Sequence, residues 1–206
     1  MILFRPVGLE ELRLVYESEM RAFPPRLPDQ PIFYPVTNQG YATQIARDWN
    51  TKSGSLAGFV TRFAVADEYA SKFERRVVGG REHEELWVPA EELAAFNQHL
   101  DGTIGVIAAY FGAAYRGCVP EGFGLRGKDA SAQFLALART RPYNAFDVTC
   151  ELAMNHTAVF LNFFHWEQGD FAASGLSDAD RNRVLGELKV AWESGEHAAI
   201  PLGVAP

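Results

Sequence analysis

Four prolines within residues 21–31 place the strongest limit on how this chain can fold. Proline has no backbone N–H to donate and its ring fixes φ, so neither a helix nor a central strand tolerates such a density. The residue before each proline is also biased toward extended conformations. We therefore expect a stiff, extended loop here. It separates an N-terminal strand and helix, Ile2–Arg5 and Glu10–Met20, from a strand at Ile32–Val36.

The rest of the first half alternates between strand and helix patterns. Apolar and polar residues alternate over Phe59–Val65, as in a strand with one polar face. Helical spacing runs over Gly40–Trp49, and Asn38 is suited to cap that helix. The remaining expected elements are one or two helical turns at Asp67–Phe73, strands at Arg75–Val78, Glu85–Val88 and Thr103–Phe111, and a helix at Pro89–Leu100.

The second half has a helical character instead. Helices are predicted at Asp129–Thr140, at Phe146–Trp166 and from Ser177 to about Ser194, where Ser177 and Asp180 form a capping-box-like start. The fold class is therefore α+β: a mixed, split β-sheet with flanking helices over residues 1–116, followed by a helical extension over residues 117–206. We expect the extension to be separate or to pack on the first part as one unit.

Charge limits the partners that this chain can bind. Its formal net charge is −7, which argues against a protein that grips phosphate backbones. Nucleic acid is therefore not expected as a partner. Nucleic-acid binding would be expected only if four arginines formed one basic patch on the surface: Arg5, Arg26, Arg47 and Arg62.

Composition also indicates where the protein works. The apolar stretch Phe146–Trp166 is interrupted by acidic and amide side chains, so it predicts a buried helix and not a membrane span. The N-terminus lacks a basic segment followed by a long apolar run, so we expect no secretory signal and a cytoplasmic protein. Cys118 and Cys150 are then reduced thiols. Two cysteines make no zinc site by themselves, and no metal is expected.

A short predicted strand near the middle of the chain carries the most informative polar residues. Side chains repeat their direction every two residues along a strand, so His83, Glu85 and Trp87 should share one face. A carboxylate, an imidazole and a large aromatic ring on one face can form a polar site with a stacking wall. The alternative is a solvated strand end above a core tryptophan.

Five unusual motifs occur in a fixed order along the first half. They are Leu3-Phe4-Arg5-Pro6-Val7, Phe23-Pro24-Pro25-Arg26-Leu27-Pro28, Gln30-Pro31-Ile32-Phe33-Tyr34-Pro35-Val36, Ala46-Arg47-Asp48-Trp49-Asn50 and Glu85-Leu86-Trp87-Val88-Pro89-Ala90-Glu91-Glu92-Leu93. In this order they resemble a small bacterial family labelled ADP-ribosylation/crystallin proteins, over residues 1–112. One part of that label refers to ADP-ribosylglycohydrolases, which are larger, all-helical, di-magnesium proteins. The many strand patterns and the lack of a paired-aspartate signature exclude that class here.

The other part of the label refers to ADP-ribosyltransferases, and the resemblance implies a site for NAD. A Glu on a late strand is the family's catalytic residue, so Glu85 would hold a ribose hydroxyl and stabilise the oxocarbenium-like transition state. His83 stands where such members often carry Glu or Gln, and it would orient Glu85 or exchange protons. Alternatively, Glu85 is a solvated carboxylate on a strand and His83 is a structural histidine.

The resemblance also implies residues that hold the cofactor. Arg5 would bind the diphosphate or the ribose, and Arg26 would reach a substrate phosphate, since guanidinium matches phosphate bidentately. Tyr34 would stack on nicotinamide or adenine, and Arg62 would border the same cleft. The alternatives are a salt bridge at a strand end for Arg5, a solvated loop side chain for Arg26, and a half-buried core aromatic for Tyr34.

These observations lead to two hypotheses from different classes. The first is an enzyme that cleaves the nicotinamide–ribose bond of NAD and transfers ADP-ribose to a protein acceptor or to water. The second is a non-catalytic binding module that keeps the fold without the chemistry. In either case the aromatic cluster between Phe160 and Trp166 is expected to lie in the core or to contact a partner, including a second copy in a homodimer.

Overall fold

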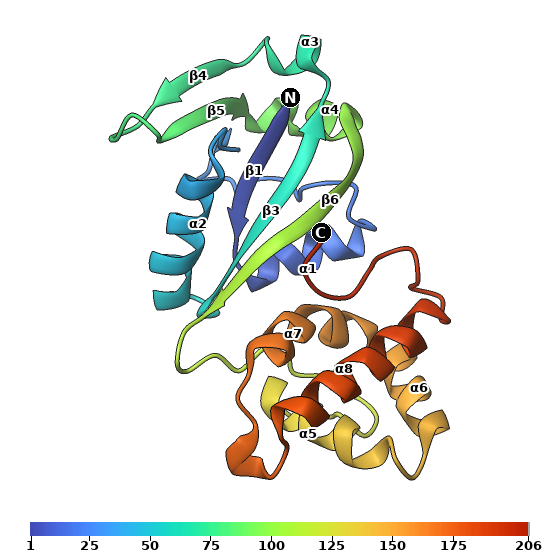
Figure 1. The fold of residues 1–206 in the computed structure, drawn as a ribbon. Coiled ribbons are helices and arrows are strands. Elements are labelled where there is room, and N and C mark those ends of the chain that lie inside the picture. Colours follow the sequence, from blue (N-terminus) through green and yellow to red (C-terminus); the bar gives the residue numbers. More distant parts are fainter. Residues whose placement is uncertain (206) are drawn as a thin grey trace. The chain divides into compact units, whose positions relative to one another are not determined.

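A computed structural model describes residues 1–205 and divides them into two compact units (Figure 1). The first unit comprises Met1–Ala113 together with Val204 and Ala205, and the second comprises Ala114–Gly203. The sequence predicts the boundary after residue 116, and the first unit of the structure runs to Ala113. The end of the chain belongs to the first unit because the Ala205 amide donates to the Val106 carbonyl over 2.8 Å.

The first unit has the alternating strands and helices that its sequence predicts. They are β1 (Ile2–Val7), α1 (Leu9–Glu17), β2 (Ile32–Phe33), α2 (Gln39–Asp48), β3 (Ala57–Val65), α3 (Asp67–Ala70), β4 (Glu74–Val77), β5 (Glu84–Pro89), α4 (Leu93–Gln98) and β6 (Leu100–Phe111), with 3₁₀ turns at Asn50–Lys52 and Ala90–Glu92. The proline-rich segment between α1 and β2 contains neither helix nor strand, as predicted. The class α+β is confirmed.

The strands form two antiparallel sheets, so the predicted mixed sheet is wrong. One sheet has the order β1-β3-β6 and the other has the order β2-β5-β4. Every strand pair in both sheets is antiparallel. Hydrophobic alternation in a sequence indicates that a strand exists and which residues share a face. It carries no information on the direction of the neighbouring strand, and that is why the prediction failed.

Val36 joins the two sheets. It forms isolated antiparallel bridges to Phe4 of β1 and to Glu85 of β5. The Phe4 amide donates to the Val36 carbonyl over 2.9 Å, and the Val36 amide donates to the Phe4 carbonyl over 2.7 Å. The predicted strand Ile32–Val36 is thus interrupted after Phe33, where Pro35 has no N–H for a continuous ladder.

The pairing through Val36 fixes which side chains share a face. Residues directly opposite one another on neighbouring strands point to the same side of a sheet. Phe4, Val36 and Glu85 therefore lie on one face, and α2 covers part of it with Tyr41. We call this the α2 face. Gly58 of β3 allows α2 to approach, because a Cβ there would collide with backbone atoms of α2.

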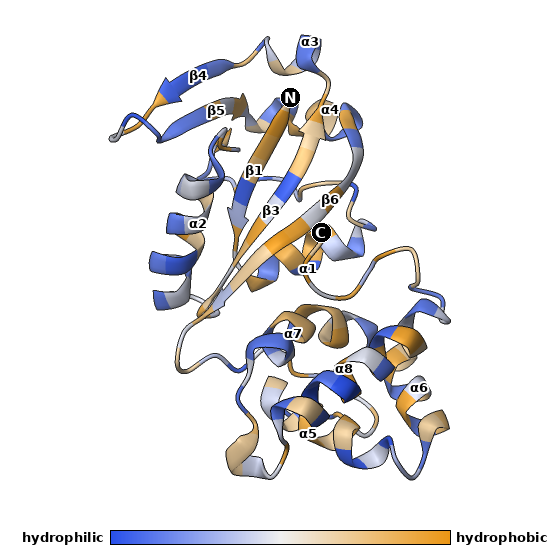
Figure 2. Cartoon of the chain, viewed as in Figure 1, coloured by the Kyte–Doolittle hydropathy of each residue, from blue (hydrophilic) through white to orange (hydrophobic). Residues whose placement is uncertain are grey.

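The opposite face of the sheets carries an aromatic core. The ring of Phe23, from the proline-rich segment, lies 5.0 Å from the Phe33 ring and 4.8 Å from the Phe63 ring, measured between centroids. Phe96 of α4 contacts Phe33 from the same side at 5.6 Å. Figure 2 shows that much of β1, β3 and β6 consists of hydrophobic residues, whereas β4 is mostly hydrophilic.

The second unit is helical within the described residues. Its elements are α5 (Ala130–Thr140), α6 (Ala145–Met154), α7 (His156–Gln168), a 3₁₀ turn at Ala172–Ser174 and α8 (Asp178–Glu193). The single helix predicted at Phe146–Trp166 is two helices. The break is at Asn155, whose backbone leaves the helical region with φ −114° and ψ 27°, while its side chain donates to Glu151 Oε2 over 2.8 Å.

Two other predictions for the helical part are confirmed. The Ser177 hydroxyl caps α8 by accepting from the Asp180 amide over 3.1 Å. The aromatic residues of α7 are buried, and Trp166 packs on Phe134 of α5 with ring centroids 5.6 Å apart. The Trp166 indole also donates to the Ala130 carbonyl over 2.7 Å. The aromatic cluster therefore belongs to the core.

Candidate functional site

The Glu85 carboxylate is held by two donors on the α2 face. The Tyr41 hydroxyl donates to Oε1 over 3.2 Å, and the Trp87 indole donates to Oε2 over 3.0 Å. Both side chains are aromatic, so the carboxylate lies among rings while remaining half-buried. The prediction that Glu85 and Trp87 share a face is confirmed by this contact.

His83 reaches this group through Tyr41. It lies in the turn before β5, and its ring stacks on the Tyr41 ring at 4.1 Å with an interplanar angle of 14°. Its Nδ1 accepts a hydrogen bond from the Gly80 amide over 3.3 Å. Tyr41 therefore occupies the position next to Glu85 that the sequence assigned to His83. Burial raises the pKa of the Tyr41 hydroxyl, and the charge of Glu85 and its hydrogen bond raise it further.

The Trp87 ring, which binds the Glu85 carboxylate through its indole N–H, contacts two further side chains. The guanidinium carbon of Arg76 lies 3.8 Å from the centroid of the Trp87 ring, and the Tyr34 ring meets it at 5.3 Å and 77°. Arg76 stands directly across from Glu85 in the β4–β5 pair. It also donates to Glu74 over 2.8 Å. We call the surface formed by Tyr34, Arg76, Glu85 and Trp87 the Trp87 site.

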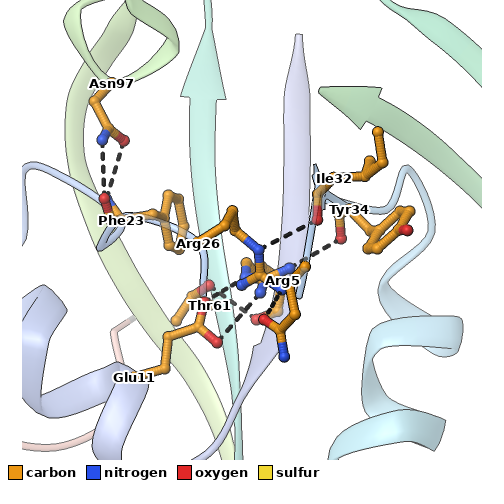
Figure 3. Close-up of polar contacts among 9 residues, drawn as sticks. Arg5, Glu11, Phe23, Arg26, Ile32, Tyr34, Thr61 and Asn97 are labelled. Carbon is orange, nitrogen blue, oxygen red and sulfur yellow. Dashed lines mark hydrogen bonds and ion pairs between the residues drawn. The ribbon is translucent and has the colours of Figure 1, made fainter. Parts of the chain in front are cut away.

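Arg5 lies on the opposite face of the sheet from Glu85. Because Phe4 points to the α2 face, its neighbour Arg5 points away from it. There Arg5 Nε donates to Glu11 Oε1 over 2.6 Å, and a terminal nitrogen donates to Glu11 Oε2 over 3.2 Å (Figure 3). Its guanidinium also lies 4.5 Å from the Phe33 ring centroid. With 7% of its surface exposed, Arg5 is a buried, paired residue.

Arg26 lies beside Arg5, as Figure 3 shows. Its Nε donates to the Ile32 carbonyl over 3.2 Å, and a terminal nitrogen donates to Gln30 Oε1 over 2.5 Å. Burial lowers the pKa of Arg26, and the positive charge of Arg5 lowers it further. These bonds fix the proline-rich loop against the start of β2, so the side chain has a structural role where the sequence predicted a phosphate contact.

Arg62 is on the α2 face, separate from the Trp87 site. It is the partner of Phe4 in the β1–β3 pair, so Arg62, Phe4, Val36 and Glu85 follow one another across the sheet. With neighbouring strands about 4.8 Å apart, three steps place its backbone about 14 Å from that of Glu85. The Arg62 side chain is exposed, and none of the ion pairs among residues 1–205 includes it.

The predicted single cleft is therefore wrong. Tyr34, His83 and Glu85 come together on the α2 face, and Arg62 shares that face at a distance, whereas Arg5 and Arg26 lie on the other face. The four arginines named for a basic patch cannot gather either, since Arg5 and Arg62 are on opposite faces. The sequence missed Tyr41 and Arg76, whose roles depend on pairing across 44 and 9 residues of chain.

Two further findings concern metals and membranes. Within residues 1–205 there is no group of three or more His, Cys, Asp and Glu side chains arranged to hold a metal ion. None of the helices in this part of the chain combines the length and apolar character of a membrane span.

Comparisons with protein-family models, with curated proteins and with solved structures find no match for this chain. The resemblance to the ADP-ribosylation/crystallin family therefore stays a prediction. The function is therefore inferred from the side chains on the two faces of the first unit and from the structure of the second unit by itself.

Proposed function

We propose that the first unit is a non-catalytic binding module whose Trp87 site receives a flat cation. The observation that carries this proposal is the Arg76 guanidinium, a flat cation, at 3.8 Å from the centroid of the Trp87 ring. The Glu85 carboxylate is bound to the edge of that same ring. An aromatic face beside a carboxylate attracts cations through the ring quadrupole and through charge.

An arginine side chain from a partner protein is the ligand that fits this chemistry best. Arg76 occupies the Trp87 ring from within the chain, and 45% of its side chain is exposed to solvent. Leaving the ring costs Arg76 an exposed cation–π contact of about 0.5–1 kcal/mol and an exposed ion pair with Glu74 of about 0–1 kcal/mol. A partner's guanidinium would then take the same place on Trp87.

Removing Arg76 tests the proposal. Arg76→Ala frees the ring, so N-acetyl-arginine amide should bind this variant more tightly than it binds the unmodified chain. The readout is the NMR shift of the Trp87 indole N–H. Arg75→Ala is the matched control, because Arg75 precedes it on the same strand and points to the other face. Equal binding by the two variants would refute the assignment.

Cleavage of NAD is the second candidate, and the two donors on Glu85 favour it. The nicotinamide ring of NAD is also a flat cation, so it suits the same aromatic face. Glu85 would stabilise positive charge on the ribose while the bond between C1′ and the nicotinamide nitrogen breaks. Nicotinamide leaves with the electron pair, and a water or acceptor oxygen bonds to C1′ and loses its proton. In this form the ADP-ribosyltransferase-like proposal uses Glu85, His83 and Tyr34 without Arg5 or Arg26.

Turnover of NAD by the purified full chain tests this second candidate. Release of nicotinamide is followed by chromatography for the unmodified chain, for Glu85→Gln and for the control Glu91→Gln, which alters an exposed carboxylate outside the site. Loss of release in Glu85→Gln alone supports the enzyme. Absence of release from the unmodified chain rejects it and leaves the arginine-binding proposal to its own measurement.

A further inference from the structure

A cavity is present in the second unit, whereas both faces discussed above belong to the first. It has a volume of about 220 Å³, is partly open to solvent and is lined by residues of α5, α6 and the segment before α5. Its lining residues are Gly124, Leu125, Ala136, Leu137, Thr140, Asp147, Val148 and Glu151. Liquid water occupies about 30 Å³ per molecule, so the space equals roughly seven waters, or a compound of seven to ten non-hydrogen atoms.

The floor of the cavity is apolar. Leu125, Leu137 and Val148 are each at most 2% exposed, and they form the buried part of the lining. Two carboxylates from α6 complete it. Asp147 and Glu151 are four residues apart, which places them on the same side of that helix. An apolar pocket with a few polar groups on one side is the usual form of a small-molecule site.

One of these carboxylates is fixed in place. Glu151 Oε1 accepts from the Gly124 amide over 2.6 Å, and Oε2 accepts from the Asn155 side chain over 2.8 Å. The approach is so close that a Cβ at Gly124 would collide with Oε1. Both bonds use Glu151 as an acceptor, so they fix the position of its side chain at the edge of the cavity.

The two carboxylates on this side of the cavity, Asp147 and Glu151, make no ion pair in the described part of the chain. Lys128, near the Gly124 segment, directs its ammonium to the Gly124 carbonyl at 2.6 Å. Two carboxylates beside an apolar space therefore favour a ligand that brings its own cation.

We propose that this cavity binds a small organic ammonium compound with an apolar body. The hydrocarbon part lies on Leu125, Leu137 and Val148, and the ammonium group meets Asp147 and Glu151. A charged hydrogen bond of this kind contributes more than a neutral one, so the ammonium group sets the affinity. The inference concerns the second unit and is independent of the Trp87 site.

Binding of 2-phenylethylamine to the full chain tests the proposal by titration calorimetry. Its neutral counterpart, 2-phenylethanol, has the same shape without the charge. We expect saturable binding of the amine and at least tenfold weaker binding of the alcohol. Asp147 is exposed, so Asp147→Asn should weaken the amine by about twofold to fivefold, whereas Glu193→Gln, an exposed carboxylate of α8, should not change it.

Several results would overturn the proposal. They are an absence of saturable amine binding, equal affinity for amine and alcohol, and equal affinity of Asp147→Asn and Glu193→Gln for the amine. Ala136→Phe provides a further check, because a ring at Ala136 would fill the cavity and abolish binding. Should that variant fail to fold, the comparison of amine with alcohol on the unmodified chain still decides the question.

Discussion

Asn162 offers the sharpest test of how the second unit is held together. Its side chain is completely buried in α7 and makes four hydrogen bonds. Oδ1 accepts from the Cys118 amide over 2.9 Å and from the Tyr115 hydroxyl over 3.3 Å. Nδ2 donates to the Cys118 carbonyl over 2.8 Å and to Gln133 Oε1 over 2.9 Å. One amide thus connects the start of the unit to α5 and α7.

Asn162→Ala removes all four bonds. A hydrogen bond contributes about 0.5–1.5 kcal/mol net, so the loss should lower the free energy of unfolding by about 4 kcal/mol. The carbonyl of Cys118 keeps a bond from Gln133 Nε2 at 2.8 Å, which limits the damage on that side. Asn162→Asp keeps the volume and the acceptor but cannot donate to the two oxygens that Nδ2 now serves. It should also be clearly destabilised.

Urea denaturation measures both effects. With a slope of about 2 kcal/mol/M, a loss of 4 kcal/mol moves the midpoint by about 2 M. Tryptophan fluorescence follows unfolding, with the buried Trp166 and Trp192 reporting on the second unit and Trp49 and Trp87 on the first. Asn182→Ala is the control, since Asn182 is exposed and its loss should stay within about 0.5 kcal/mol. A wild-type midpoint for Asn162→Asp would refute the claim that the donated bonds stabilise this unit.

Three further predictions concern charges. Glu11→Gln leaves the buried Arg5 guanidinium without its carboxylate and should cost about 3 kcal/mol of unfolding free energy in urea. Burial lowers the pKa of His165, so the unfolded chain binds the proton more readily than the folded chain. The free energy of unfolding should therefore fall as pH drops below about 6.5 and should level off below the folded-state pKa. His165→Gln should remove this part of the pH dependence. Glu85→Gln removes a charge that raises the pKa of Tyr41, so an NMR titration should show that pKa moving down toward its ordinary value.

Each of these predictions has a control and a contrary outcome. Glu17→Gln removes an exposed partner of Arg13 and should cost less than about 1 kcal/mol, so an equal loss for Glu11→Gln would contradict the buried pair. A pH profile unchanged in His165→Gln would mean that other groups account for the loss of stability in acid. An unchanged pKa of Tyr41 in Glu85→Gln, with Glu91→Gln as control, would contradict the hydrogen bond between the two side chains.

Local patterns in the sequence predicted most of the elements because those patterns act over a few residues. Asn38 caps α2 by accepting from the Tyr41 amide over 3.0 Å, as its position indicated. The proline-rich segment is irregular because each proline by itself lacks a backbone N–H and has a fixed φ. Asn155 shows the limit of this approach, since the helical pattern of Phe146–Trp166 runs across a position where the backbone leaves the helical region.

The candidate site depended on information that no single stretch contains. Arg5 and Glu85 were both placed correctly on strands, and the prediction failed only on the face to which each points. That face is set by the bridges of Val36, which join segments more than 30 and almost 50 residues apart. A shift of one residue in either bridge would have brought Arg5 to the side of Glu85. The register of the strands, and not the type of each residue, therefore decides on which face of the sheet Arg5 and Glu85 lie.

The connection at Val36 has a consequence for local unfolding. Toward β1 it consists of the two hydrogen bonds between Val36 and Phe4, and toward β5 it includes the bond from the Leu86 amide to the Pro35 carbonyl over 2.8 Å. The β1-β3-β6 sheet, by contrast, has β3 paired along its length on both sides. β4, the exposed edge strand of the other sheet, should therefore open first, and its amides should exchange with deuterium long before those of β3.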